Sequence, residues 1–241
     1  MLFTDEVVNA FRFIFSDYRV YLQIGTVLFS ISLIRKLAYA VMDNPYIFWA
    51  LVISSELLLY LQVGYGSYIS LYTLKGRDYL PKIRNIKKIF FEGIKKSYVI
   101  YIYVLIIISF SMISGIYFNV ASDILVFVVH VLIYCVMILG LINRYLHHGS
   151  FIKAFNAGDM RTIFKNIKLK NFALVVVCVF FSQFAVANSA ITYSGGLSLF
   201  NVVSLVASFF IAPAVVIFTK RLTALHIRKL FADSIYHYKL E

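Results

Sequence analysis

The sequence predicts an all-α membrane protein that crosses a bilayer about six times. Of its 241 residues, 61% are hydrophobic and only 14% are charged, and the mean hydropathy is +0.85. A soluble domain of this length does not need so much apolar surface, so the excess must face lipid. Helices are expected because a spanning backbone must satisfy its own hydrogen bonds, and six stretches provide nearly 20 apolar residues or more. They use most of the chain, so a single integral membrane domain over 1–241 is expected.

The six expected spans differ in strength. They cover residues 18–34, 46–74, 97–118, 124–142, 172–192 and 197–219. The first is short and contains Gln23, whereas the second is long enough to tilt or to project from the bilayer. Asp5 and Glu6 precede the first span and no small-residue cleavage site follows, so no secretory signal peptide is expected.

The basic residues predict the orientation. Eight Lys and Arg lie in 75–96, six in 143–171 and five from residue 220 onward, whereas 119–123 and 193–196 have none. Basic connections stay in the cytoplasm, so both termini are expected inside a multi-pass protein of the cytoplasmic membrane. Arg35 and Lys36 fall on the other side, where we expect them to reach headgroups or to pair with Asp43 or an anionic lipid.

Three stretches of the sequence resemble one another. They are VVNAFRFIFSDYRVYLQI (7–24), IKKIFFEGIKKSYVIYIYVLI (86–106) and FIKAFNAGDMRTIFKNIKLKNFALVV (151–176). Each predicts an amphipathic helix, a polar elbow and then a span, and the spans that follow begin near 18, 97 and 172. The elbows share one side, which predicts three parallel hairpin repeats, each preceded by a cytoplasmic interfacial helix. Chance similarity among basic Ile- and Phe-rich elbows is the alternative.

The cytoplasmic amphipathic segments are expected at 3–16, 80–96, 151–170 and 221–238. Their basic residues would contact anionic headgroups, which makes membrane lipids the expected partner. The residues expected to make these contacts are Lys87, Lys88, Lys95, Lys96, Lys165, Lys168, Arg228 and Lys229. The basic charge follows the membrane topology, so no nucleic-acid partner is expected, whereas a homo-oligomer or a membrane protein complex remains open.

Two segments carry a resemblance to a known kind of protein. They are GYGSYISLYTLKGRDYLP (64–81) and FIKAFNAGDMRTIFKNIKLKNF (151–172), with Gly64, Gly66, Leu80, Pro81, Ala154 and Phe155 as the matching positions. The chain resembles an uncharacterised family of polytopic membrane proteins of methanogenic archaea and some bacteria. It is also similar in pattern to the membrane region of some glycerophosphodiester phosphodiesterases. The resemblance implies a helical membrane bundle without an assigned catalytic residue, and the phosphodiesterase domain is absent.

Two ionisable residues lie inside expected spans, where a charge is costly and calls for a reason. Glu56 lies about ten residues into the second span and His130 about six into the fourth, so their depths are similar. One interpretation is a binding or proton-relay site in which the two face each other and Gln183, Asn188 and Asn201 complete a polar interior. The other is that these groups only hold helices together.

Other conspicuous residues have ordinary structural interpretations. Gly64 and Gly66 would allow close approach of a neighbouring helix, and Pro213 would bend the sixth span. Cys135 and Cys178 lie in apolar runs. The adjacent His147 and His148 point in different directions on a helix, so no metal site is expected, and no motif indicates a cofactor.

Three function classes remain. The favoured one is a non-enzymatic accessory, scaffold or complex subunit of the membrane, because four basic amphipathic segments would dock a partner or organise lipid. The alternative is a small transporter or permease component with a polar site around Glu56 and His130. A lipid-active enzyme would have only that pair as acid and base, so enzymatic activity is uncertain and not favoured.

Overall fold

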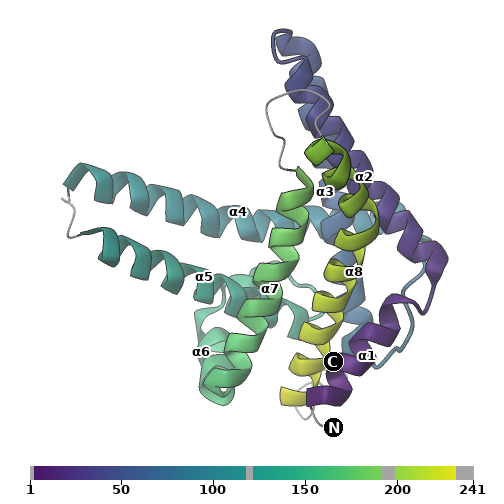
Figure 1. Cartoon of the computed structure of the whole chain (residues 1–241). Helices are drawn as coiled ribbons and strands as arrows, with labels where there is room; N and C mark the ends of the chain where they lie inside the picture. The colour runs from purple at the N-terminus through teal and green to yellow at the C-terminus, as the bar shows by residue number, and fades with distance from the viewer. Residues whose placement is uncertain (1–2, 118–121, 191–198, 232–241) are drawn as a thin grey trace. The chain divides into compact units, whose positions relative to one another are not determined.

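The computed structural model describes residues 3–117, 122–190 and 199–231 (Figure 1), and it describes the side chains of residues 4–113, 126–182 and 202–231. The regular structure in these ranges is helical. The elements are α1 (Phe3–Ile14), α2 (Tyr18–Ala40), α3 (Pro45–Leu74), α4 (Ile86–Tyr117), α5 (Ser122–Leu146), the 3-10 helix η1 (Ile152–Phe155), α6 (Ala157–Asn166), α7 (Leu169–Ala190) and α8 (Leu199–Leu230).

Five helices among the described residues are long and apolar enough to cross a membrane. They are Tyr18–Ala40, Pro45–Leu74, Ile86–Ile113, Val126–Leu146 and Val202–Leu230. The described apolar part of α7 is shorter and covers Leu169–Ser182. These findings support a helical membrane protein. A sixth span over 172–192 stays a prediction because much of it lies outside the described side chains.

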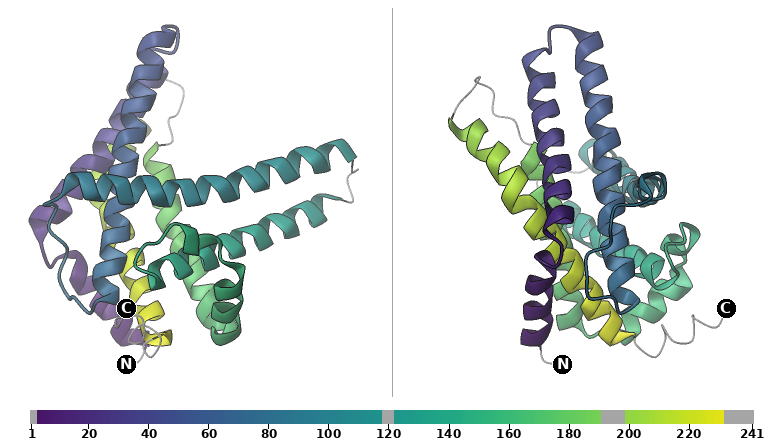
Figure 2. Two further views of the ribbon diagram at one scale, coloured as in Figure 1. Left: turned by 180° about the vertical axis from the view of Figure 1, so that it is seen from behind. Right: turned by 90° about the vertical axis from the view of Figure 1, so that its right-hand side faces the viewer.

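The chain forms two compact units. Unit 1 contains Met1–Ile94 and Val177–Phe231, and its core is made by α1, α2, α3 and α8. In both figures α2 and α3 lie side by side as a hairpin, and α8 packs against both and crosses them obliquely (Figures 1 and 2). Buried apolar residues of these four helices, among them Phe13, Leu28, Ile69 and Ile217, form one cluster.

Local signals set the ends of these helices. The Asp17 side chain accepts hydrogen bonds from the backbone of Arg19 and Val20 and starts α2, and the Asn44 side chain followed by Pro45 starts α3. Both are standard N-terminal devices. α3 ends at Leu74, and Gly76 follows with a φ of +78°, which glycine adopts without strain.

Close helix approaches depend on glycines. A Cβ on Gly64 would lie 1.9 Å from the carbonyl oxygen of Ile89, and one on Gly93 would lie 1.7 Å from that of Tyr60. α3 and the first turns of α4 therefore cross with their backbones in contact, as small residues allow in membrane helices. A Cβ on Gly25 would likewise lie 2.5 Å from the carbonyl oxygen of Phe209 in α8.

Unit 2 contains Lys95–Val176 together with 232–241, the latter being outside the described residues. In it α5 packs against η1 and α6. A Cβ on Gly140 of α5 would lie 2.4 Å from the carbonyl oxygen of Ala154, and the Tyr103 hydroxyl donates to that same oxygen at 3.2 Å. The ring of Tyr103 also stacks on Phe155.

The expected elbows appear at two of the three places. The helix breaks after Ile14, ahead of α2, and again at Ile167, which is extended between α6 and α7. In the middle stretch α4 is continuous from Ile86 to Tyr117. Pro81 disfavours helix before it and Asn85 caps the start of α4, whereas no residue between 86 and 117 breaks the helix. The amphipathic segment expected at 80–96 thus continues into the next span.

Two further boundaries differ from the expected ones. α2 continues to Ala40, six residues beyond the expected end at 34, because Arg35 and Lys36 remain helical and Arg35 has a partner in α3. α8 continues through Pro213 and residue 220 to Leu230, so the last span and the first part of the expected segment 221–238 form one helix. The threefold repeat stays a prediction.

Candidate functional site

Glu56 pairs with an arginine of its own hairpin. Its Oε1 lies 2.5 Å from Nη2 of Arg35, and Arg35 Nε donates to Ser55 Oγ at 3.3 Å. The side chains of Arg35 and Glu56 are 24% and 33% exposed. Ser55 is fully buried and donates its hydroxyl to the carbonyl oxygen of Val52. An ionic contact therefore joins α2 to α3. Arg35 was expected to reach headgroups or to pair with Asp43, so the sequence interpretation missed this partner.

His130 makes its contacts within unit 2. Its Nε2 lies 2.7 Å from Ser111 Oγ of α4, and its Nδ1 lies 2.7 Å from the carbonyl oxygen of Val126 one turn earlier in α5. A carbonyl oxygen only accepts, so Nδ1 donates to Val126, while Ser111 Oγ also donates to the carbonyl oxygen of Ile107 at 2.9 Å. The contact links α4 to α5.

The proposed polar interior is only partly described. Glu56 belongs to unit 1 and His130 to unit 2, and each has the contacts given above. Gln183, Asn188 and Asn201 have side chains outside the described ones. A site shared by these residues therefore stays a prediction.

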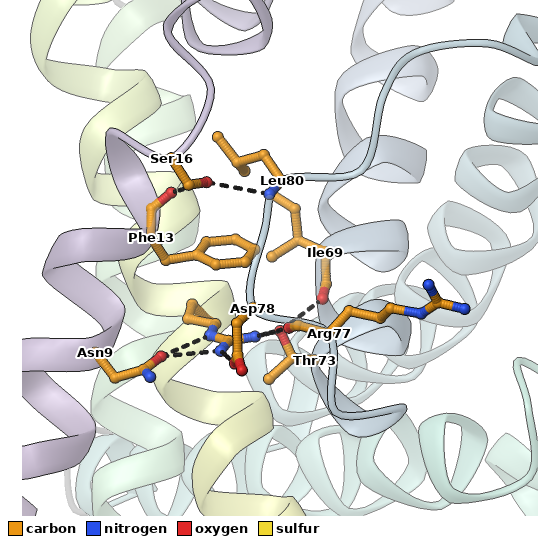
Figure 3. A network of polar contacts seen from close by, with 9 residues as sticks. Asn9, Phe13, Ser16, Ile69, Thr73, Arg77, Asp78 and Leu80 are labelled. Atoms are coloured by element: carbon orange, nitrogen blue, oxygen red, sulfur yellow. Dashed lines mark hydrogen bonds and ion pairs between the residues drawn. The ribbon is translucent and has the colours of Figure 1, made fainter.

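The most extensive polar contacts of unit 1 surround Arg221 of α8, a fully buried residue (Figure 3). Its five N–H groups are all used. Nε and Nη2 donate to Asn9 Oδ1 at 3.1 and 2.9 Å. Nη1 donates to Thr73 Oγ1 at 3.0 Å and to the Arg77 carbonyl oxygen at 2.6 Å. Nη2 also donates to Asp78 Oδ1 at 2.5 Å. We call these five residues the Arg221 clamp.

Hydrophobic and backbone contacts support the clamp. The Arg221 guanidinium lies 4.3 Å from the ring centre of Phe13, which adds a cation–π attraction. The connection after Asp78 is held as well, because Leu80 N–H donates to Ser16 Oγ at 3.1 Å and the buried Tyr65 hydroxyl donates to the Pro81 carbonyl oxygen at 2.7 Å. The clamp thus joins α1, α3, α8 and the α3–α4 connection.

A buried carboxylate lies one helical turn further along the same interface. Glu6 of α1 is 2% exposed, its Oε2 lies 3.2 Å from His226 Nδ1, and its Oε1 lies 3.1 Å from Lys229 Nζ. Both partners belong to α8. Lys229, expected to contact headgroups, therefore also pairs within the protein.

Unit 2 has a polar contact outside its spans. Lys153 Nζ donates to Asp159 Oδ2 at 2.9 Å, and the Asn143 side chain donates to the Lys153 carbonyl oxygen at 2.6 Å. The hydrogen bond from Lys153, with the nearby charges of Lys153 and His147, holds the pKa of the Asp159 carboxyl below its ordinary value. This contact ties η1 to α6.

The basic residues expected to meet headgroups differ in exposure. Lys87, Lys88, Lys95, Lys165, Lys168 and Lys229 are exposed, and Arg228 is half-buried. Lys96 is only 4% exposed, and its ammonium lies 5.6 Å from the ring centre of Tyr145. Its long side chain packs inside unit 2, so it is the least accessible of the set to a headgroup.

No group of three or more metal-ligating side chains occurs among the described residues. The Gly64 backbone lies against α4, as noted above, whereas a Cβ on Gly66 would lie 3.5 Å from Cε of Lys220. Pro213 is buried inside α8. The described polar groups of the spans can therefore hold helices together, and Lys82, Arg84 and the exposed lysines can attract anions.

Comparison with known proteins places the chain in a family. Neither a curated protein nor a solved structure matches it significantly. A family model described as "Protein of unknown function (DUF4013)" matches residues 46–193, which is more than half of the chain. The resemblance to an uncharacterised family is supported, while its distribution and its likeness to phosphodiesterase membrane regions stay predictions. The chain belongs to the DUF4013 family of proteins of unknown function.

Proposed function

We propose that this protein is a non-enzymatic accessory or scaffold component of a membrane complex. The observation that carries the proposal is that several charged and polar groups of the described spans contact other helices of their own unit. Arg35 holds Glu56, Ser111 holds His130, and the clamp uses every donor of Arg221. Such contacts fix helices against one another.

Exposed groups support the same proposal. Lys87, Lys88, Lys165 and Lys168 are accessible on segments beside the spans, where they would meet an acidic partner surface or anionic lipid. A rigid bundle with accessible basic segments is suited to holding other components at the membrane.

The alternative of a small transporter component has one observation in its favour. The Arg35–Glu56 pair is between one quarter and one third exposed within two helices long enough to span. A charged pair at such a place would respond to an ion or proton that reached it along an aqueous path.

The test is purification of the tagged chain from its native host after mild cross-linking. A scaffold component is expected to bring down at least one other membrane protein in constant stoichiometry. A chain recovered alone, with cysteines at positions 54–66 labelled by a membrane-impermeant thiol reagent along one helix face, would overturn the proposal in favour of the transporter.

A further inference from the structure

A hollow lies on unit 1 between α2, α3, the α3–α4 connection and the start of α4. Its deep wall is made by Ile24, Tyr65 and Ile89, which are buried, and its rim by Val27, Leu61 and Ile83, which are half-buried. The space free of atoms is about 290 Å³, including the open mouth.

The apolar lining of the hollow favours a hydrocarbon ligand. The accessible atoms of the hollow are apolar, and an apolar cavity of this kind stays dry. Its walls include two helices that are long and apolar enough to span a membrane, so lipid chains are its natural neighbours. A few methylene groups would fill the deep part while the rest of an acyl chain lay along the rim.

The connection beside the hollow supplies positive charge. Residues 82–88 read KIRNIKK, with four basic residues and no acidic one. Ile83 forms part of the rim, and Lys82 and Arg84 on either side of it are exposed, as are Lys87 and Lys88 in the first turn of α4. The N-terminus of α4, capped by Asn85, adds a favourable dipole for an anion.

Acidic groups near this end are fewer than the basic ones. Asp78 pairs with Arg221, which leaves Asp17, an acceptor of backbone hydrogen bonds from Arg19 and Val20, and Glu92 of α4. The four basic residues of 82–88 outnumber these two carboxylates, so the charge next to the hollow is net positive. An apolar groove with a basic rim matches a molecule that has a hydrocarbon tail and an anionic head.

We propose that this groove binds one anionic phospholipid, with part of an acyl chain in the hollow and the phosphate near Lys82 and Arg84. Gln62 also borders the hollow, but it adds no accessible polar surface to it, so recognition rests on the apolar lining and on the basic rim. The site goes beyond the scaffold function and does not depend on any protein partner.

The test measures lipid retention by the full chain. Protein is reconstituted into vesicles of equal phosphatidylglycerol and phosphatidylcholine, released into mild detergent, and examined by native mass spectrometry. Wild type is expected to retain one phosphatidylglycerol per chain. Val27→Trp and Leu61→Trp fill the groove and should each lower retention at least fivefold, whereas Leu57→Trp, on an exposed position of α3, should not.

Charge variants separate a specific site from general surface attraction. Lys82→Gln with Arg84→Gln should lower the preference for phosphatidylglycerol by roughly fivefold per charge, whereas Lys165→Gln with Lys168→Gln, an equal loss of charge in unit 2, should leave it unchanged. Equal effects of the two pairs, or full retention in both groove-filling variants, would overturn the proposal. Lys82 and Arg84 are exposed, so the Lys82→Gln with Arg84→Gln variant should fold, and it tests the site even if a tryptophan variant does not fold. A variant that loses the lipid but still co-purifies with a protein partner separates this proposal from the scaffold function. A variant that keeps the lipid but loses the partner does the same.

Discussion

Alanine substitutions at two glycines of α3 should have opposite effects on stability. A Cβ at Gly64 would lie 1.9 Å from the Ile89 carbonyl oxygen, a backbone atom that cannot rotate away. A Cβ at Gly66 would have Lys220 Cε at 3.5 Å as its nearest neighbour, which is an ordinary contact with a flexible side chain. Gly66→Ala is therefore the matched control, two residues away in the same helix.

The size of the difference follows from two terms. Replacing glycine by alanine inside a helix stabilises it by about 0.5–1 kcal/mol, and this is the whole effect expected for Gly66→Ala. In Gly64→Ala the helices must separate by at least about 1 Å, and overpacking of this kind costs about 1–3 kcal/mol or more. The net result is a destabilisation of about 0–2.5 kcal/mol, and more where the two backbones cannot separate.

The assay is reversible unfolding of the purified chain in mixed micelles of mild and denaturing detergent, followed by circular dichroism and a thiol-reactive probe of Cys178. Gly64→Ala should unfold at lower denaturing-detergent content than wild type, and Gly66→Ala at the same or higher content. Equal midpoints for the two variants would refute the backbone contact between α3 and α4.

Three further predictions use the same unfolding measurement. Arg221→Met should lower the free energy of unfolding by about 2–4 kcal/mol because buried hydrogen bonds to a charged group are lost. Asp78→Asn should lower it by under about 1 kcal/mol, since the Asp78 side chain is 73% exposed. Equal losses for the two variants would contradict the clamp. Glu56→Leu alone should destabilise the protein more than the double variant Arg35→Leu with Glu56→Leu, because the single change leaves the Arg35 charge among apolar side chains without its carboxylate. A double variant that is less stable than the single one would contradict this. The pKa of Asp159 is lowered in the folded protein, so its contribution to folding stability is present above about pH 4 and is lost as the pH falls through the folded pKa. Asp159→Asn should reduce this loss of stability at acid pH. An unchanged dependence of stability on pH would count against the Lys153 contact.

The spans could be predicted from sequence because a span is a continuous run of apolar residues, which is a local property of the sequence. Five described helices match expected spans, and their starts follow from nearby signals such as Asp17 and the Asn44–Pro45 pair. Their extents were harder to predict. Arg35 and Lys36 were expected to end the first span, but an arginine with a carboxylate partner in the next helix can remain inside one.

Long-range partners could not be predicted from one sequence. Arg221 and Asn9 are 212 residues apart. Arg221 was expected to meet anionic headgroups as part of the last amphipathic segment, but it is buried. Nothing in its neighbours distinguishes it from the exposed Arg84. Its burial depends on where α1 and the α3–α4 connection pack, and a single sequence does not record that packing.

The same reasoning accounts for the candidate polar site. The position of Glu56 and His130 inside apolar stretches could be predicted from hydropathy, but their partners depend on helix rotation. Arg35 and Ser111 reach them from the preceding helix of each hairpin. The hollow of unit 1 was also not predicted, because its lining comes from three helices and a connection that share no motif.

The clamp between Asn9 and Arg221 also affects how the protein is made. At a synthesis rate of 5–20 residues per second, the 212 residues that separate them take about 10–40 s to appear. During that time α1 lacks the α8 surface on which it packs, and Glu6 lacks both His226 and Lys229. The earliest helix to emerge can therefore dock only when the last has been inserted. Assembly of unit 1 therefore depends on completion of the chain, and a chain that stops before α8 would leave Glu6 without both of its partners.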